Sequence, residues 1–402
     1  MTGPRRKLKI LLLTHNLADV GGSYRRAFSL ARQLAALGHT VHLMAGRRWP
    51  GKDRIMTPID GLRVLEMADW MPERIRGGGL SPIDAVGRLT WVLRRKVDVI
   101  HAFDHRPAVS LPALLGRVRG GVLISDWADL WGPQGIGQER EGLGGRLLAR
   151  ADGSWETGFR RHVDGVTPIN AHLDARLARM GIPGDRRMLL PPGANADVIR
   201  PLPKREMRWL QGLPEDAHVV AFIGFADYDL DFLTRAVVEI LGRDPTAHLV
   251  TAGADLSVLP EAVERAGLQA RLHMLGFIPY SSLERVLACA DAFLLPFTSR
   301  PVNLGRFPNK LGDYLAAGRP IVTHPTGDME AWIGSTGAGI LASEDPVEFA
   351  DEVIRLMNDP RRCLKMGRQA RRLAEGELSW STLAARVEGF YYRLIEAKAQ
   401  PG

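Results

Sequence analysis

A short segment, Arg300–Pro320, carries two cations and a carboxylate around the start of a predicted helix. Arg306 lies in the loop before this helix, Lys310 lies in its first turn and a half, and Asp313 follows three residues later on the same side. Two cations at the positive end of a helix suit a pyrophosphate, and a carboxylate one turn deeper would accept hydrogen bonds from a ribose diol. The alternative is a surface helix with an ordinary Lys–Asp pair, worth only about 0.2–0.5 kcal/mol.

The position of this segment in the sequence favours a ligand site over an ordinary surface helix. The segment follows "DAFLLPF", which is predicted to be a buried strand, so it begins at the carboxyl end of a strand, where open α/β sheets bind their ligands. Pro308 is suited to begin the helix and Gly318 to end it. Asn303 would add a hydrogen-bond donor and an acceptor. We therefore expect a diphosphate and a sugar hydroxyl to bind here.

A second anion site is predicted after the first strand. Gly21 and Gly22 directly precede Ser23, which is placed to cap a helix. Paired glycines let the backbone approach a ligand closely, and the N-terminus of a helix offers free N–H groups to a phosphate. The alternative is a simple turn before the helix. The stretch is neither a complete dinucleotide fingerprint nor a Walker A loop, which disfavours an NAD site or a P-loop.

The order of elements predicts an α/β protein with two Rossmann-like domains. Apolar runs alternate with segments of helical spacing, a pattern typical of a parallel sheet covered on both faces. The pattern breaks into Pro, Gly and Asn over 186–206 and then restarts. We expect domains over 1–190 and 191–375 that face each other across a cleft. The predicted strands are 8–15, 40–46, 62–67, 97–103, 121–129, 163–170, 218–224, 247–253, 272–278, 291–297, 319–325 and 338–343.

The composition excludes several classes of protein. The chain is 45% hydrophobic and 24% charged, and it has no apolar run of the ~18 residues that a membrane span requires. The N-terminal apolar run, Ile10–Leu13, is interpreted as a strand, since no small-residue cleavage site of a signal peptide follows it. Cys289 and Cys363 lack the spacing of metal ligands or of a disulfide framework. We therefore expect a cytoplasmic protein with neither a disulfide framework nor a zinc site.

The positive charge is concentrated in the first half of the chain. Residues 1–190 contain 30 Lys and Arg against 18 Asp and Glu, whereas residues 191–402 contain 23 against 27. A basic first half indicates an anionic partner, although basic residues scattered over a solvated surface would give the same count. The segment 70–96 mixes apolar residues with Arg, so peripheral binding to the inner face of an anionic membrane is a second hypothesis. A nucleic-acid partner is not expected, because no binding motif accompanies the charge.

Nearly the whole chain resembles the GT-B glycosyltransferases of family 4. The resemblance is carried by "GGSYRRAFSLARQLAALGHTVHLMAG", "DVIHAFDHRP", "PPGANADVIRP" and "KLGDYLAAGRPIVTHPTGDMEAWI". It implies retaining transfer of a sugar from a nucleotide-diphosphate sugar, without a metal or other cofactor. It also implies that the C-terminal helix, within 376–402, crosses back to the first domain. The acceptor would be a glycan, a lipid-linked sugar or a small molecule.

The sequence departs from the family pattern in the donor domain. The family usually carries two Glu residues separated by seven others; here Asp313 stands at the second position and Gly305 at the first. The usual Arg and Lys after the first strand of the second domain are also missing, and Phe225 stands in place of the Arg, with Asp227, Asp229 and Asp231 nearby. Arg306 and Lys310, and as a further candidate Arg300, are the substitutes for these phosphate ligands.

Two strand ends of the first domain supply acceptor-side candidates. After 97–103 come Asp104 and His105, for sugar positioning or acceptor deprotonation, and Arg106, for an acceptor or phosphate contact. At the end of 121–129, Asp126 beside Trp127 is typical of a sugar site, although packing explains a Trp equally well. Two alternative functions remain open: a GT-B protein that binds a nucleotide or glycan without catalysis, and a nucleotide-sugar epimerase.

Overall fold

The computed structural model describes residues 6–224, 228–253 and 256–400. The chain divides into two compact units, which are considered separately. The first consists of Met1–Gly193, Gly305–Phe307 and Trp380–Gly402, and the second of Ala194–Leu304 and Pro308–Ser379. The boundaries lie three and four residues beyond the predicted ones at 190 and 375. The assignment of Gly305–Phe307 to the first unit was not expected.

The first unit contains a seven-stranded sheet in the order β3-β4-β2-β1-β5-β6-β7. Neighbouring strands are parallel except for β3 and β4. The six strands predicted in this half are confirmed, and β3 is an additional, largely exposed edge strand. The strands are β1 (Lys9–Leu17), β2 (Thr40–Gly46), β3 (Arg54–Ile59), β4 (Leu62–Glu66), β5 (Val99–Phe103), β6 (Val122–Trp127) and β7 (Gly165–Pro168).

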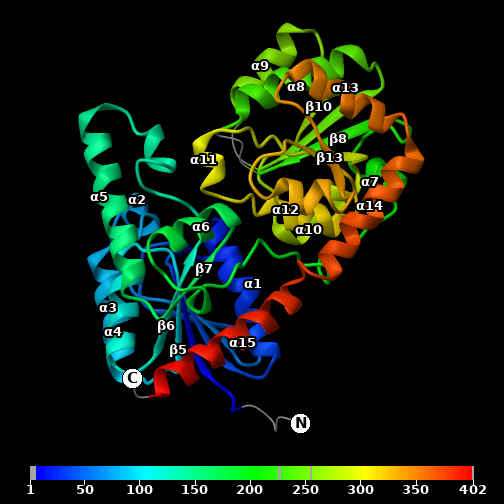
Figure 1. Cartoon of the computed structure of the whole chain (residues 1–402). Helices are drawn as coiled ribbons and strands as arrows, with labels where there is room; N and C mark the ends of the chain where they lie inside the picture. The colour runs from blue at the N-terminus through cyan, green and yellow to red at the C-terminus, as the bar shows by residue number, and fades with distance from the viewer. Residues whose placement is uncertain (1–5, 225–227, 254–255, 401–402) are drawn as a thin grey trace. The chain divides into compact units, whose positions relative to one another are not determined.

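Helices cover both faces of this sheet (Figure 1). Helix α15, at the end of the chain, packs beside α1, and its apolar residues join those of β1 and β2 in one core. Helix α3 packs against α4 on the other side. The helices of the first unit are α1 (Gly22–Ala36), α2 (Glu73–Gly77), α3 (Pro82–Arg94), α4 (Pro107–Val118), α5 (Gly142–Arg161), α6 (Ala171–Arg179) and α15 (Trp380–Ala399).

The second unit contains a six-stranded parallel sheet in the order β10-β9-β8-β11-β12-β13. All six strands predicted for this half are confirmed, several of them shorter than expected. The architecture is therefore the expected pair of Rossmann-like domains. The strands are β8 (His218–Ile223), β9 (Ala247–Ala252), β10 (Leu272–Met274), β11 (Ala292–Leu294), β12 (Ile321–Thr323) and β13 (Gly339–Leu341).

Two groups of helices enclose the second sheet (Figure 1). Helix α8 packs against α9 and α13 on one side, and α12 packs against α10 and α14 on the other. The carboxyl ends of β8 and β11 lead into the segments that were singled out for donor binding. The helices are α7 (Lys204–Leu210), α8 (Leu230–Arg243), α9 (Val258–Arg265), α10 (Tyr280–Ala288), α11 (Pro301–Leu304), α12 (Lys310–Ala317), α13 (Pro346–Met357) and α14 (Pro360–Glu375).

Candidate functional site

In the second unit, Lys310 lies at the carboxyl end of β8. It is the first residue of α12, two residues later than the start predicted at Pro308. Its Nζ lies 3.8 Å from the centre of the Phe222 ring. A Cβ on Gly224, which has φ +91°, would lie 3.5 Å from the Lys310 Cε. The ammonium therefore lies over the end of the strand, where the resemblance predicts the diphosphate.

Helix α12 is tied to this strand end by Tyr314. The backbone N–H of Ile223 donates to the Tyr314 hydroxyl at 2.8 Å, and the ring stacks on Phe293 with centroids 4.1 Å apart. Burial raises the pKa of Tyr314, so its hydroxyl stays neutral. Gly318 ends the helix in the left-handed conformation, as predicted. The packing thus fixes the first turn of α12 against β8.

The predicted ribose ligand, Asp313, is oriented by Tyr280. The Tyr280 hydroxyl donates to Asp313 Oδ1 at 2.8 Å. Asn195 Nδ2 donates in turn to the Tyr280 oxygen at 3.0 Å. The carboxylate is half-buried, so part of it faces solvent. Sequence reasoning missed Tyr280 and Asn195, because nothing in their local sequence distinguishes them from ordinary helix and loop residues.

The predicted direct role of Asn303 is corrected by its position. Asn303 is fully buried on α11. Its amide Nδ2 donates to Asp229 Oδ2 at 3.0 Å and to the Thr298 carbonyl at 2.9 Å. Thr298 Oγ1 also donates to Asp229, at 2.6 Å. Asn303 therefore holds the buried carboxylate that precedes α8, with its amide directed into the protein.

The structure also places some of the other residues that were noted in the donor domain. Asp231 is exposed and pairs with Arg235 at 2.8 Å, an ordinary surface pair. Arg300 donates to the Tyr228 carbonyl. Phe225 and Asp227 lie outside the described residues.

In the first unit, the predicted helix α1 begins at the glycine pair, but its cap differs from the predicted one. Gly21, with φ +86°, precedes the helix, which begins at Gly22, and Ser23 does not cap it. Asn16, at the end of β1, performs this function instead, because its Oδ1 accepts from the Tyr24 N–H at 3.1 Å. A Cβ on Gly21 would lie only 2.7 Å from that oxygen. Gly21 and Gly22 are exposed, so a phosphate can reach the start of the helix.

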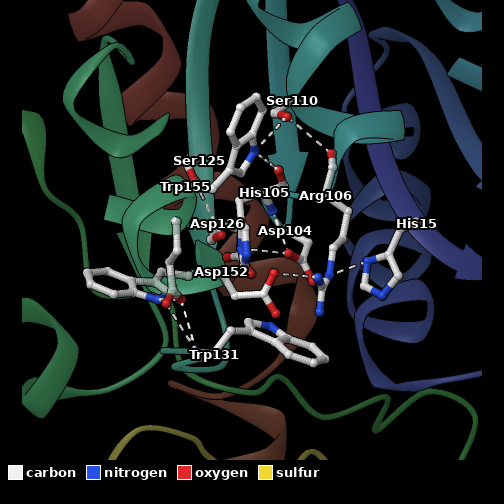
Figure 2. Close-up of polar contacts among 12 residues, drawn as sticks. His15, Asp104, His105, Arg106, Ser110, Ser125, Asp126, Trp131, Asp152 and Trp155 are labelled. Atoms are coloured by element: carbon white, nitrogen blue, oxygen red, sulfur yellow. Dashed lines mark hydrogen bonds and ion pairs between the residues drawn. The ribbon is translucent and has the colours of Figure 1, made fainter. Parts of the chain in front are cut away.

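Asp104 and His105 are brought together with His15, a residue that sequence reasoning did not select (Figure 2). Asp104 Oδ2 lies 3.1 Å from His15 Nδ1, and Asp104 Oδ1 lies 2.8 Å from His105 Nδ1. Burial disfavours the charge of Asp104, but His15, His105 and Arg106 outweigh burial and hold its pKa below the usual range. Asp104 has φ +107°, a strained backbone conformation for a residue with a side chain.

Arg106 is already engaged within the first unit. Its NH1 lies 3.0 Å from Asp152 Oδ1, and its guanidinium carbon lies 4.4 Å from the centre of the Trp131 ring (Figure 2). Arg140 pairs with the other oxygen of Asp152 at 2.7 Å. A phosphate or an acceptor that bound Arg106 would have to compete with this ion pair.

The acceptor role predicted for Asp126 and Trp127 is also corrected. Asp126 is buried and receives two hydrogen bonds from Arg26, at 2.9 and 3.0 Å. Trp127 is fully buried, and its Nε1 donates to Glu156 Oε1 at 2.7 Å. Both side chains are thus buried and hydrogen-bonded within the first unit.

Arg306 belongs to the first unit, whereas it was expected in the donor domain. Its carbonyl accepts from Asn170 Nδ2 at 2.9 Å, and its backbone bridges Asp129. A Cβ on Gly305 would lie 2.7 Å from the Cβ of Leu130. This close approach explains why glycine, and not Glu, stands at the family's first acidic position.

Asp129, which is bridged to the Arg306 backbone, has a raised pKa. Burial raises its pKa to about 6; Arg306 opposes the shift, whereas Asp104, Glu156 and Asp126 add to it. A carboxyl group with this pKa exchanges protons near neutral pH, as general acid–base catalysis requires. Among the described residues, no group of three or more His, Cys, Asp and Glu is placed to hold a metal ion.

Comparison with known proteins agrees with these features. Residues 21–193 match the model described as glycosyl transferase 4-like domain, and residues 217–359 match glycosyl transferases group 1. A D-inositol 3-phosphate glycosyltransferase of Catenulispora acidiphila is 24% identical over 98% of this chain and 97% of its own. A GDP-mannose-dependent phosphatidylinositol monomannoside mannosyltransferase of Mycobacterium tuberculosis is 27% identical over 82% of this chain and 97% of its own.

The fold has solved counterparts as well. Sucrose-phosphate synthase of Thermosynechococcus elongatus matches with a TM-score of 0.76 and 17% identity, over 97% of this chain and all of that one. The two family models together cover most of the chain, and the relatives align along nearly all of their length. The chain therefore belongs to the family 4 glycosyltransferases with the GT-B fold.

Proposed function

We propose that the chain is a retaining, metal-independent glycosyltransferase that moves a sugar from a nucleotide-diphosphate sugar to an acceptor hydroxyl. The observation that carries the proposal is the position of Lys310 over the carboxyl end of β8. Asp313 lies one turn further along the same helix, oriented by Tyr280. Cation and carboxylate are thus spaced for the diphosphate and the ribose of one nucleotide.

The reaction requires no nucleophile from the protein. The bond from the sugar C1 to the diphosphate oxygen breaks, and a bond from C1 to the acceptor oxygen forms on the same face. The acceptor proton passes to the departing diphosphate, whose growing negative charge is stabilised by Lys310. Electrostatic stabilisation of this kind is usually the largest contribution to catalysis.

We propose an acceptor that carries a phosphate, of the inositol phosphate class. The printed names of two relatives refer to D-inositol 3-phosphate and to a phosphatidylinositol mannoside. The excess of Lys and Arg in residues 1–190 favours an anionic acceptor. Asp104, His105 and Asp129 are the candidates for contact with the acceptor hydroxyl in this unit.

Peripheral attachment to an anionic membrane is a further part of this proposal. In the first half of α5, Leu143, Leu147 and Leu148 are exposed beside Arg146 and Arg150. In α3, Val86 and Leu93 are exposed and are followed by three exposed basic residues, 94–96. Apolar side chains flanked by Arg are typical of surfaces that rest on anionic lipid. Among the described residues, no helix is both long and apolar enough to cross a bilayer.

A panel of nucleotides and nucleotide sugars in a thermal-shift assay tests donor binding first, because a ligand that binds only the folded state raises the melting temperature. Turnover is then measured with inositol phosphate as acceptor. Binding without turnover would favour the non-catalytic alternative. Isomerised sugar formed from the donor in the absence of acceptor would favour the epimerase.

A further inference from the structure

A chain of polar contacts leads from the start of α1 to Asp104. The Tyr24 N–H donates to Asn16 Oδ1 at 3.1 Å. A backbone N–H can only donate, so this bond fixes which end of the Asn16 amide is the oxygen. The opposite end, Nδ2, then lies 3.1 Å from His15 Nε2. Since an amide NH₂ can only donate, His15 Nε2 must be the acceptor.

This bond determines where His15 carries its proton. A neutral imidazole whose Nε2 accepts a hydrogen bond has its proton on Nδ1. Burial lowers the pKa of His15, although Asp104 opposes the shift, so the neutral ring is favoured at neutral pH. His15 Nδ1, the protonated nitrogen, therefore lies 3.1 Å from Asp104 Oδ2. The Tyr24 N–H thus fixes the orientation of the Asn16 amide, and the amide in turn fixes the tautomer of His15.

Asp104 also contacts His105. Its second oxygen lies 2.8 Å from His105 Nδ1 and also accepts from the His105 backbone N–H. His15 Nδ1 and His105 Nδ1 form no hydrogen bond in the described structure, so their contacts with Asp104 act through charge. Of the two neutral tautomers of His105, an ionised Asp104 favours the one with its proton on Nδ1 and its lone pair on Nε2. The Nε2 atom is buried and has no hydrogen-bond partner in the described structure.

Other charged groups also face these imidazoles. Arg106, His105 and Arg88 act on His15 in the opposite sense to Asp104. Arg88 comes from α3, where it pairs with Asp84 at 2.8 Å and donates to the Thr14 carbonyl. The two arginines disfavour a second proton on His15, which reinforces the neutral ring that the bond from Asn16 requires.

We propose that Asn16 and His15 are positioning residues that hold the Asp104 carboxylate beside His105 and so favour the His105 tautomer whose lone pair is on Nε2. The proposal rests on the proposed function, in which Asp104 and His105 act on the acceptor. It also accounts for Gly21, because a side chain there would displace the Asn16 oxygen, 2.7 Å from the position of its Cβ. The glycine pair and the imidazoles thus belong to one connected site.

The substitution Asn16→Asp tests the direction of the contacts. Aspartate caps a helix as well as asparagine does, so one oxygen still accepts from the Tyr24 N–H. The other oxygen cannot donate to His15 Nε2 and favours a proton there. The tautomers are read from ¹H–¹⁵N correlations of ¹⁵N-histidine-labelled full-length protein, and the variants His15→Gln and His105→Gln assign the signals. Asn358→Asp, at an exposed asparagine on the second unit, is the matched control.

We expect the wild-type protein and Asn358→Asp to carry the His15 proton on Nδ1 and the His105 lone pair on Nε2. In Asn16→Asp we expect His15 Nε2 to become protonated and the pH profile of kcat/KM to shift. A wild-type His15 protonated on Nε2, or an unchanged tautomer in Asn16→Asp, would overturn the proposal. These signals are measured without turnover, so they stand even if no glycosyl transfer is found.

Discussion

The ammonium of Lys310 lies 3.8 Å from the centre of the Phe222 ring, at the carboxyl end of β8. The phosphate-binding cations that the family usually carries after this strand are missing from the sequence. Lys310 brings a positive charge to the same strand end from helix α12, much further along the chain. The contact with the ring is a cation–π contact, which helps to hold the ammonium at the strand end.

Replacing this cation is expected to impair catalysis strongly. Lys310→Ala should lower kcat/KM for the nucleotide sugar by about 100-fold to 1,000-fold, since it removes a preorganised charge from the leaving group. Lys365→Ala, at an exposed lysine of the same unit, is the control and should change kcat/KM less than about twofold. Steady-state kinetics at saturating acceptor measures both, and equal effects would contradict the role of Lys310.

Removing the charge of Asp129 is expected to stabilise the protein at neutral pH. Because its pKa rises to about 6 on folding, the folded state holds a proton between the ordinary Asp pKa and pH 6 that the unfolded state releases. The ionisation of Asp129 therefore lowers the free energy of unfolding as the pH rises through that range. Asp129→Asn should raise the free energy of unfolding at pH 7.5 by about 1–3 kcal/mol, and the gain should vanish near pH 4.

Urea unfolding of Asp129→Asn at both pH values measures this difference. The control is Asp231→Asn, because Asp231 is exposed and forms only a surface pair. A loss of stability at pH 7.5 would show that the folded protein stabilises the ionised Asp129 carboxylate, which would contradict its raised pKa. A loss of activity together with a gain of stability would support a role for Asp129 at the acceptor.

A methyl group at Gly21 is expected to disturb the start of α1. The backbone has φ +86°, and the new Cβ would lie 2.7 Å from Asn16 Oδ1. Gly21→Ala should lower the free energy of unfolding by about 1–2 kcal/mol and weaken donor binding. Gly144→Ala has no atom within 4 Å of its new Cβ and lies in helix α5, so it should be neutral or slightly stabilising. Similar losses in both variants would argue against a special role for Gly21.

The exposed apolar residues of α5 are expected to bind anionic lipid. Leu147→Glu should reduce flotation of the protein with vesicles that contain phosphatidylinositol or phosphatidylglycerol, because it removes apolar area and adds a repelled charge. Leu364→Glu, at an equally exposed leucine of the second unit, should leave flotation unchanged. Binding that is insensitive to salt, or absent in the wild type, would contradict the proposed membrane surface.

The sequence was sufficient for most of the fold, because buried parallel strands are continuous apolar runs. It failed for β3, an edge strand whose side chains are mostly exposed and which therefore lacks such a run. It also misplaced the cap of α1. Ser23 satisfies the local rule, but Asn16 supplies the oxygen from the end of the preceding strand.

The candidate site was predicted less completely, because its residues meet through tertiary contacts. Lys310 and Asp313 share one helix, so their spacing could be read directly. Tyr280 and His15 come from other elements, and their partners are distant in sequence. Asp126 was misassigned because a polar residue at a strand end can also pair inside the core, as it does here with Arg26.

The anomeric configuration of the product tests the central claim most directly. The protein is incubated with a nucleotide sugar of known configuration and an inositol phosphate acceptor, and the product is analysed by NMR before and after addition of a chelator. We predict a glycoside with the configuration of the donor, formed at the same rate after chelation. An inverted product, or a reaction that stops when metal ions are removed, would contradict a retaining, metal-independent transfer.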